Sequence, residues 1–222
     1  MAATTVGARL SFERAKDAIQ TAGFNLNRAV LSQSYLRSEV VLSTSVTRYR
    51  FPLLVNDNFG IGGGLTTTTT SQLLNLQDAF YVSHIGLYFA KPSSSTDSTF
   101  QLVTYPNQII FSTANTASSL YQFYNGFLTL TVNNRVVVPN MDLYRFYDVP
   151  QTQDGSTGGT IIDQQKGSDS ALYPIEPGIV LVGSKQNQLE VVLPAALTAV
   201  ESNSRAVIQF FGHLAQNVTP VN

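Results

Sequence analysis

The chain has 222 residues, no cysteine and a formal net charge of −1. Only 12% of its residues are charged, about half the share of an average domain. Without cysteine, a disulfide scaffold, a thiol nucleophile and a zinc–thiolate site are excluded. A hydrophobic content of 43% excludes a disordered chain. No stretch reaches the ~18 apolar residues of a membrane span. The N-terminus lacks the apolar core of a signal peptide, which predicts folding in a cytoplasm.

Neutral polar residues take the place of the missing charges: the chain contains 22 Thr, 21 Ser, 15 Asn and 15 Gln. A near-neutral surface of this kind favours contact with other copies of the same chain over free solubility. The length suits one large β domain or two small ones. Composition therefore points to self-association before any motif is considered.

The first predicted element is an amphipathic helix near residues 11–23. Ser11 suits its N-cap, and Gly23 suits a left-handed end. A second, short helix is predicted around residues 27–34. The apolar stripe of the first helix comprises Phe12, Ala15, Ala18, Ile19 and Ala22.

From about Glu39 onward the apolar period changes from helical spacing to two, which predicts strands. In residues 47–53, for example, Tyr49 and Phe51 share one face, whereas Arg48 and Arg50 share the other. Strands are predicted at 47–53, 79–90, 99–104, 108–112, 127–132, 135–138, 143–147, 179–182, 189–193 and 206–214. The predicted core comprises Tyr49, Phe51, Ile85, Leu87, Phe89, Leu128, Leu130, Leu189, Val191, Ile208 and Phe210.

The connections between these strands are turns and loops. Asn133-Asn134 suits a two-residue hairpin turn, because Asn tolerates positive φ. Short strands without crossover helices predict an all-β, antiparallel sandwich or barrel. We therefore expect one β-sandwich domain at residues 39–222, preceded by a basic arm at residues 1–38. Two long loops, 59–74 and 150–177, are expected to contact other subunits or to be mobile.

Residues suited to catalysis are few. The two histidines, His84 and His213, each lie inside a long apolar strand, and no G-x-S-x-G elbow is present. The glycines at 60–64 are followed by threonines and not by the Lys and helix of a phosphate loop. The acidic residues at 154, 163 and 169 lack the spacing of a calcium loop. We therefore expect no catalytic, cofactor or metal site, and no enzyme.

The N-terminal quarter is the only net-positive region, with +4 over residues 1–50 against −5 over the remainder. Six of its seven basic residues are Arg, whose planar guanidinium pairs with phosphate. Three interpretations stay open: contact with phosphates, ion pairing at a subunit interface, and a solvated face. The candidate contact residues are Arg9, Arg14, Lys16, Arg28, Arg37, Arg48 and Arg50.

The chain combines a basic arm with a β-sandwich, and it contains the segments TRYRFPLLVN at 47–56 and LQDAFYV at 76–82. With these features it resembles a viral capsid protein of the jelly-roll kind, and among viruses those of bacteria. The resemblance implies eight strands in two sheets. It also implies a self-assembling virion structural protein of a non-enveloped virus or phage, assembled in the host cytoplasm. The implied partners are other copies, other virion proteins and, through the arm, genomic nucleic acid without sequence preference. The alternative is a head-decoration, fibre or receptor- or carbohydrate-binding module.

Overall fold

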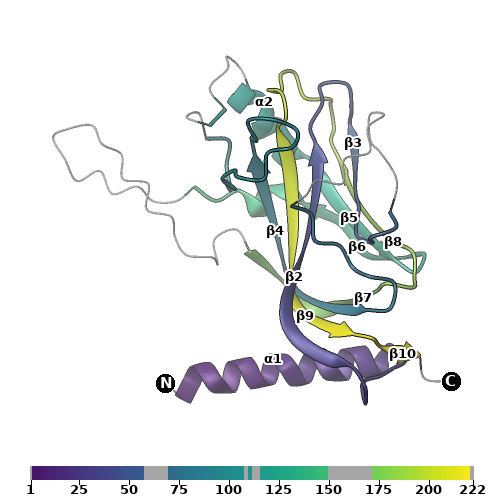
Figure 1. The fold of residues 1–222 in the computed structure, drawn as a ribbon. Helices are drawn as coiled ribbons and strands as arrows, with labels where there is room; N and C mark the ends of the chain where they lie inside the picture. Colours follow the sequence, from purple (N-terminus) through teal and green to yellow (C-terminus); the bar gives the residue numbers. More distant parts are fainter. Residues whose placement is uncertain (1, 58–69, 108–109, 112–115, 150–171, 221–222) are drawn as a thin grey trace.

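A computed structural model describes residues 2–57, 70–107, 110–111, 116–149 and 172–220, with side chains from Ser11 onward. Eight main strands form two four-stranded antiparallel sheets, which pack face to face as a β-sandwich (Figure 1). The first sheet has the order β2 (Val30–Val41), β9 (Arg205–Gln216), β4 (Ala79–Ala90), β7 (Leu172–Val182). The second has the order β3 (Arg48–Phe51), β8 (Asn187–Val192), β5 (Phe127–Val132), β6 (Arg135–Asp142). The all-β prediction is confirmed.

The strand pairs are nested along the chain. β5 pairs with β6 at the centre, and moving outward β4 pairs with β7, β3 with β8, and β2 with β9. The β5–β6 connection is the predicted hairpin turn, with φ of 50° at Asn133 and 62° at Asn134. Two further pairings, β4 with β9 and β5 with β8, complete the sheets. The chain therefore runs as one long hairpin that is folded over on itself.

Smaller elements lie at the two ends of the sandwich. Helix α1 (Ala2–Thr21) crosses the end where both termini lie (Figure 1). The short pair β1 (Phe24–Asn25) and β10 (Thr219–Pro220) joins the two terminal segments there. The connection from β4 to β5 contains α2 (Thr116–Tyr121) and the 3₁₀ turn η1 (Gln122–Asn125). A second 3₁₀ turn, η2 (Leu143–Phe146), follows β6.

The core lies between the two sheets, where the alternating side chains of each sheet meet. Aromatic residues contribute much of its volume: Phe89 packs edge-on against Phe123, with ring centroids 5.3 Å apart. Every residue of the predicted core is at most 1% exposed, which confirms the choice of strand faces. These residues are Tyr49, Phe51, Ile85, Leu87, Phe89, Leu128, Leu130, Leu189, Val191, Ile208 and Phe210.

Helix α1 is longer than predicted. It begins at Ala2 and not at Ser11, because no proline precedes Ser11 and the helix tolerates Gly7. Its end is as predicted, with Gly23 at a φ of 90°. Ala15 and Ile19 are fully buried against the end of the first sheet, whereas Phe12 is 38% exposed. The apolar stripe therefore docks the second half of the helix onto the body.

Three predicted elements are wrong. Residues 27–34 form no helix, because β2 begins at Val30 and pairs with β9 over its whole length. Residues 99–104 form only one bridge, between Val103 and Phe89. Residues 143–147 form η2 and not a strand, since the Asp142 carboxylate accepts a hydrogen bond from the backbone N–H of Tyr144 and caps the turn. Most of the predicted strand at 108–112 lies outside the described residues.

The boundaries of the arm and of the loops also differ from expectation. Residues 30–38 of the expected arm are paired with β9 and so belong to the sandwich. Within the first long loop, residues 58–69 lie outside the described part, but Gln72 bridges Arg37 and Leu74 bridges Leu54. Within the second, residues 150–171 lie outside it, and residues 172–177 form the start of β7.

Candidate functional site

The basic residues of the N-terminal quarter do not gather on one surface. Arg14 forms an exposed ion pair with Glu176 at 3.5 Å. Lys16 and Arg28 have no carboxylate at ion-pair distance among the described residues. The side chain of Arg9 is not among those described.

Arg48 and Arg50 lie on the outer face of the second sheet, as their strand alternation predicts. Both reach Glu190 on β8: Arg50 Nε lies 2.6 Å and Arg48 Nη1 3.9 Å from its carboxylate oxygens. The Arg48 side chain is 62% exposed, so this pair of cations is only partly neutralised. Four of the seven candidate residues, Arg14, Arg37, Arg48 and Arg50, therefore form ion pairs within the subunit. The sequence analysis did not consider this arrangement.

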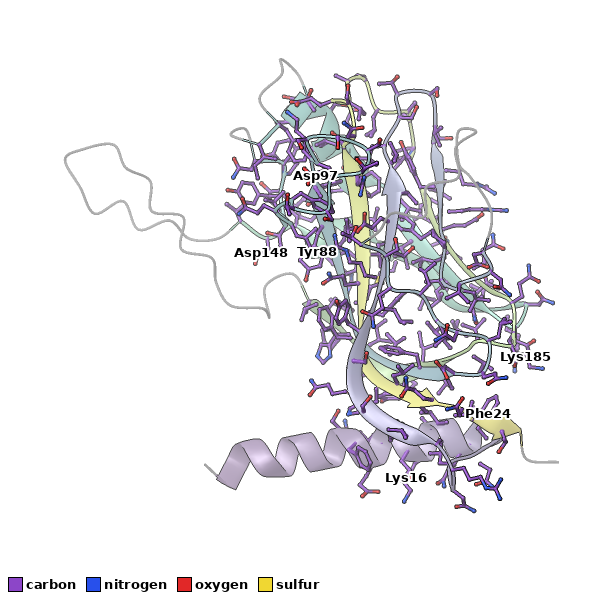
Figure 2. All side chains as sticks on the ribbon, viewed as in Figure 1. Lys16, Phe24, Tyr88, Asp97, Asp148 and Lys185 are labelled. Carbon is purple, nitrogen blue, oxygen red and sulfur yellow. The ribbon has the colours of Figure 1, made fainter. Side chains whose placement is uncertain are left out.

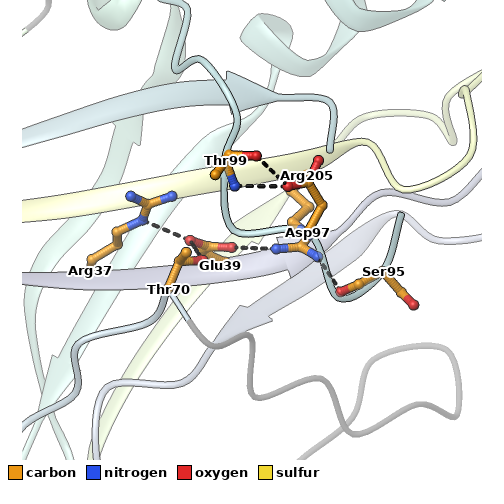
Figure 3. A network of polar contacts seen from close by, with 7 residues as sticks. All are labelled: Arg37, Glu39, Thr70, Ser95, Asp97, Thr99 and Arg205. Atoms are coloured by element: carbon orange, nitrogen blue, oxygen red, sulfur yellow. Dashed lines mark hydrogen bonds and ion pairs between the residues drawn. The ribbon is translucent and has the colours of Figure 1, made fainter. Parts of the chain in front are cut away.

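A buried ionic network surrounds Glu39 on the outer face of the first sheet (Figure 3). The Glu39 carboxylate is fully buried and accepts hydrogen bonds from Arg37 Nε at 2.7 Å, Thr70 Oγ1 at 2.7 Å and Arg205 Nη1 at 3.0 Å. Buried charges are tolerated when they are paired and hydrogen-bonded in this way. The network joins β2, β9 and the segment that begins at Thr70.

Loop 92–104 covers this network. Arg205 Nη2 donates to the carbonyl oxygen of Ser95 at 2.7 Å, and the Arg37 and Arg205 guanidiniums lie 5.2 and 5.4 Å from the Phe100 ring centroid. Hydrogen bonds to its carboxylate, the one from the side chain of Ser93 first, hold the pKa of Asp97 well below its usual value. Figure 3 shows the bonds that Thr99 donates to Asp97. The network therefore fastens a surface loop to the sheet, which is a structural role.

The two histidines lie in different surroundings. His84 Nδ1 lies 3.0 Å from Ser83 Oγ within β4. His213 on β9 is buried under α1, where its ring meets Phe12 edge-on with centroids 6.1 Å apart. Burial lowers the pKa of His213, and its Nδ1 atom has no hydrogen-bond partner among the described residues. The Ser83 hydroxyl itself donates to the carbonyl oxygen of Phe211 at 3.0 Å. The described part of the chain contains no group of three or more His, Asp or Glu side chains that could hold a metal ion.

A cluster of tyrosines lies where β4–β5 and β6–β7 connect. Tyr147 is at its centre, with Tyr144 stacked on it at an interplanar angle of 16° and a centroid distance of 5.7 Å. The ring of Tyr121 packs at a tilt against that of Tyr147, with ring centroids 5.8 Å apart, and the ring of Tyr124 meets it edge-on with centroids 5.2 Å apart. We call these four residues the tyrosine cluster.

The tyrosine cluster has a buried base and an exposed top. Tyr124 is 2% exposed and donates a hydrogen bond to the carbonyl oxygen of Thr104 at 2.6 Å. Tyr144 is 63% and Tyr121 42% exposed. A hydrogen bond with Tyr121, followed by burial, raises the pKa of Tyr147 to about 12. Asp148 follows Tyr147 in the chain, and Figure 2 shows it well separated from Lys16 and Phe24 at the α1 end. The tyrosine cluster is therefore distant from α1.

Sequence reasoning missed this cluster. Its members come from two connections that are distant in the chain, and Tyr144 and Tyr147 were assigned to a strand. Comparison with family models, curated proteins and solved structures finds no match to this chain. None of the described helices is long and apolar enough to cross a membrane.

Proposed function

We propose that the chain is a virion structural protein: a self-assembling capsid subunit of a non-enveloped virus or phage, built on a jelly roll. The proposal includes location in the virion after assembly in the host cytoplasm, and it assigns the chain no catalytic role. The observation that carries it is the nested order in which the strands pair.

The four pairs alternate between the two sheets. Passing inward from the chain ends, β2–β9 lies in the first sheet, β3–β8 in the second, β4–β7 in the first and β5–β6 in the second. A long hairpin wrapped in this way is the connectivity of a double-sheet jelly roll, an architecture used by viral capsids, lectin domains and cupins. The strand order supports a jelly-roll fold. It does not distinguish a capsid protein from a lectin domain or a cupin, so that choice depends on further observations.

Helix α1 supports the assembly role. Its second half is docked by Ala15 and Ile19, whereas its first half extends past the edge of the sandwich (Figure 1). An isolated helical segment is marginal in water, so the projecting half needs a second surface. A neighbouring copy supplies one, and the low charge of the chain suits contact between copies.

Contact with the genome is the weaker part of the proposal. Arg14, Lys16 and Arg28 lie on α1 or the turn after β1, and only Arg14 among them has an ion-pair partner in the described structure. Such cations bind phosphates without sequence preference, and binding weakens linearly with log salt. We therefore propose that the α1 end faces the interior of the particle or a neighbouring subunit.

The test is a truncation that removes residues 1–23. A truncation to residue 38 is unsuitable, since it removes most of β2. We expect the shortened chain to keep the circular dichroism of the sandwich and to form no particles by electron microscopy, whereas the full chain forms them. Glu176→Gln, which breaks the exposed Arg14–Glu176 ion pair and leaves the cations of α1 in place, is the matched control. Normal particles from the truncated chain, or a full chain that stays monomeric at every concentration, would contradict the proposal.

A second candidate function is a receptor- or carbohydrate-binding module of a virion. The observation that favours it is the exposed tyrosine cluster, because amphipathic aromatic side chains are enriched where proteins bind ligands and partners.

A further inference from the structure

We propose that the tyrosine cluster binds a neutral saccharide, with Tyr144 and Tyr121 as the contact surface. This inference does not depend on the capsid proposal, because every residue of the cluster belongs to a single subunit. It assigns a ligand class to a surface that the assembly role leaves unused.

The cluster is rigid and yet exposed. Tyr147 is held on three sides by the rings of Tyr121, Tyr124 and Tyr144, and Tyr124 is anchored to the backbone of Thr104. Despite these contacts, Tyr144 leaves 63% of its surface in water. A preorganised surface loses little conformational entropy when a ligand binds. Tyrosine combines an apolar ring face with a polar hydroxyl, which matches a sugar that presents C–H groups on one face and hydroxyls at its edge.

Charge argues for a neutral ligand. The segments that carry the cluster and its base, 104–107, 116–126 and 142–149, contain Asp142, Arg145 and Asp148 as their only charged residues, with a net charge of −1. The one cation, Arg145, donates a hydrogen bond to the Tyr173 hydroxyl and lies over its ring. Aromatic surfaces that bind single-stranded nucleic acid combine their rings with a cationic groove. The described segments around the rings contain no cationic groove, so a phosphate-bearing ligand is disfavoured.

Polar side chains lie on the same connections as the tyrosines, together with the exposed Val149. Asn125 is exposed, and Gln122 and Asp148 are half-buried. Amides and carboxylates can exchange hydrogen bonds with sugar hydroxyls, whereas the fully buried centre of a protein interface is depleted in charged residues. A stable protein interface also needs ~800 Å² from each partner, far more than two exposed rings provide. These features favour a saccharide over a protein partner.

The experiment uses the full-length chain and three neutral hexasaccharides: maltohexaose, cellohexaose and hexa-N-acetylchitohexaose. Because the protein has no tryptophan, its intrinsic fluorescence comes from its ten tyrosines, four of which form the cluster. Saturation-transfer NMR and fluorescence titration should show binding of at least one hexasaccharide, with a dissociation constant of about 1 mM or tighter. Tyr144→Ala should weaken binding about tenfold, and Tyr144→Phe should keep it within about threefold.

Tyr35→Ala is the matched control, since Tyr35 is 43% exposed but packs on Phe211 on the outer face of the first sheet. It should bind as the wild type does. The proposal is overturned if none of the three hexasaccharides binds, or if Tyr144→Ala binds as well as the wild type. It is also overturned if the Tyr144→Ala chain changes its oligomeric state while saccharide binding is unaffected, which would make the cluster a subunit contact. The two proposals can fail separately. A full-length chain that forms no particles but binds a saccharide contradicts the capsid proposal and leaves the saccharide proposal standing.

Discussion

Replacing Glu39 by Gln removes the central charge of the buried network at almost constant volume. Two guanidiniums then lose their countercharge, and that of Arg205 is only 2% exposed, so water cannot replace the lost partner. Breaking a buried ion pair by removing one member costs about 3–5 kcal/mol. Since a domain is stable by ~5–15 kcal/mol, we expect Glu39→Gln to lose a large part of the free energy of unfolding.

The assay is urea denaturation at pH 7, followed by circular dichroism and tyrosine fluorescence, with the slope against urea checked for constancy. Glu176→Gln is the control, because the Arg14–Glu176 pair is 66% and 74% exposed and such pairs contribute ~0–1 kcal/mol. The double variant Glu39→Leu/Arg205→Met should be more stable than Glu39→Gln, since it leaves only one cation unpaired in the network. If Glu39→Gln costs no more than Glu176→Gln, the argument that the buried network stabilises the sandwich is refuted.

Further predictions concern the strands that flank the core and α1. Ile208→Ala should cost about 2–5 kcal/mol in the same assay, because Ile208 is fully buried; a loss below about half a kcal/mol would show that the site can collapse. Gly212→Ala should cost at least about 1–3 kcal/mol, because an added Cβ would lie 1.8 Å from the carbonyl oxygen of Tyr81; wild-type stability would refute this. Burial lowers the pKa of His213, so the unfolded chain binds a proton there more readily, and the contribution of His213 to stability should fall as the pH drops below about 6.5. Thermal unfolding between pH 7.5 and pH 5 measures this loss of stability, which should be smaller in His213→Gln than in the wild type. An equal loss in both proteins would show that His213 is not responsible.

The two faces of β3 could be predicted from the sequence, whereas the strand conformation of β2 could not, although both are edge strands. In β3 a buried aromatic alternates with an exposed Arg, and that period determines which face points inward. The first half of β2 has no such period, because its outward and inward positions there are both largely exposed. Its strand conformation depends on the backbone hydrogen bonds to β9, more than 160 residues away in the chain. Pairing at this distance overrides the weak local preference.

The candidate sites were less predictable for a similar reason. A net charge summed along residues 1–50 predicts a cationic arm, but the partners of those cations come from elsewhere in the chain: Glu190 for Arg48 and Arg50, and Glu176 for Arg14. Likewise, the ten tyrosines of the sequence include no motif that predicts which of them meet. Contacts between connections of different strand pairs depend on topology, which a single sequence specifies only through the complete fold.

The topology places the two proposed activities at opposite ends of the subunit. Consecutive strands reverse direction, so the β4–β5 and β6–β7 connections leave the sandwich at one end, whereas β2 begins and β9 finishes at the other, beside α1 (Figure 1). If α1 faces the interior of a particle, the tyrosine cluster therefore lies on the far side, away from the genome. Intact particles should then bind the hexasaccharide through Tyr144 as the free subunit does, while residues 1–23 resist added trypsin despite containing Arg14 and Lys16. Particles that trypsin cuts after Lys16 without disassembling, and that no longer bind the saccharide, would show that the subunit is oriented the other way.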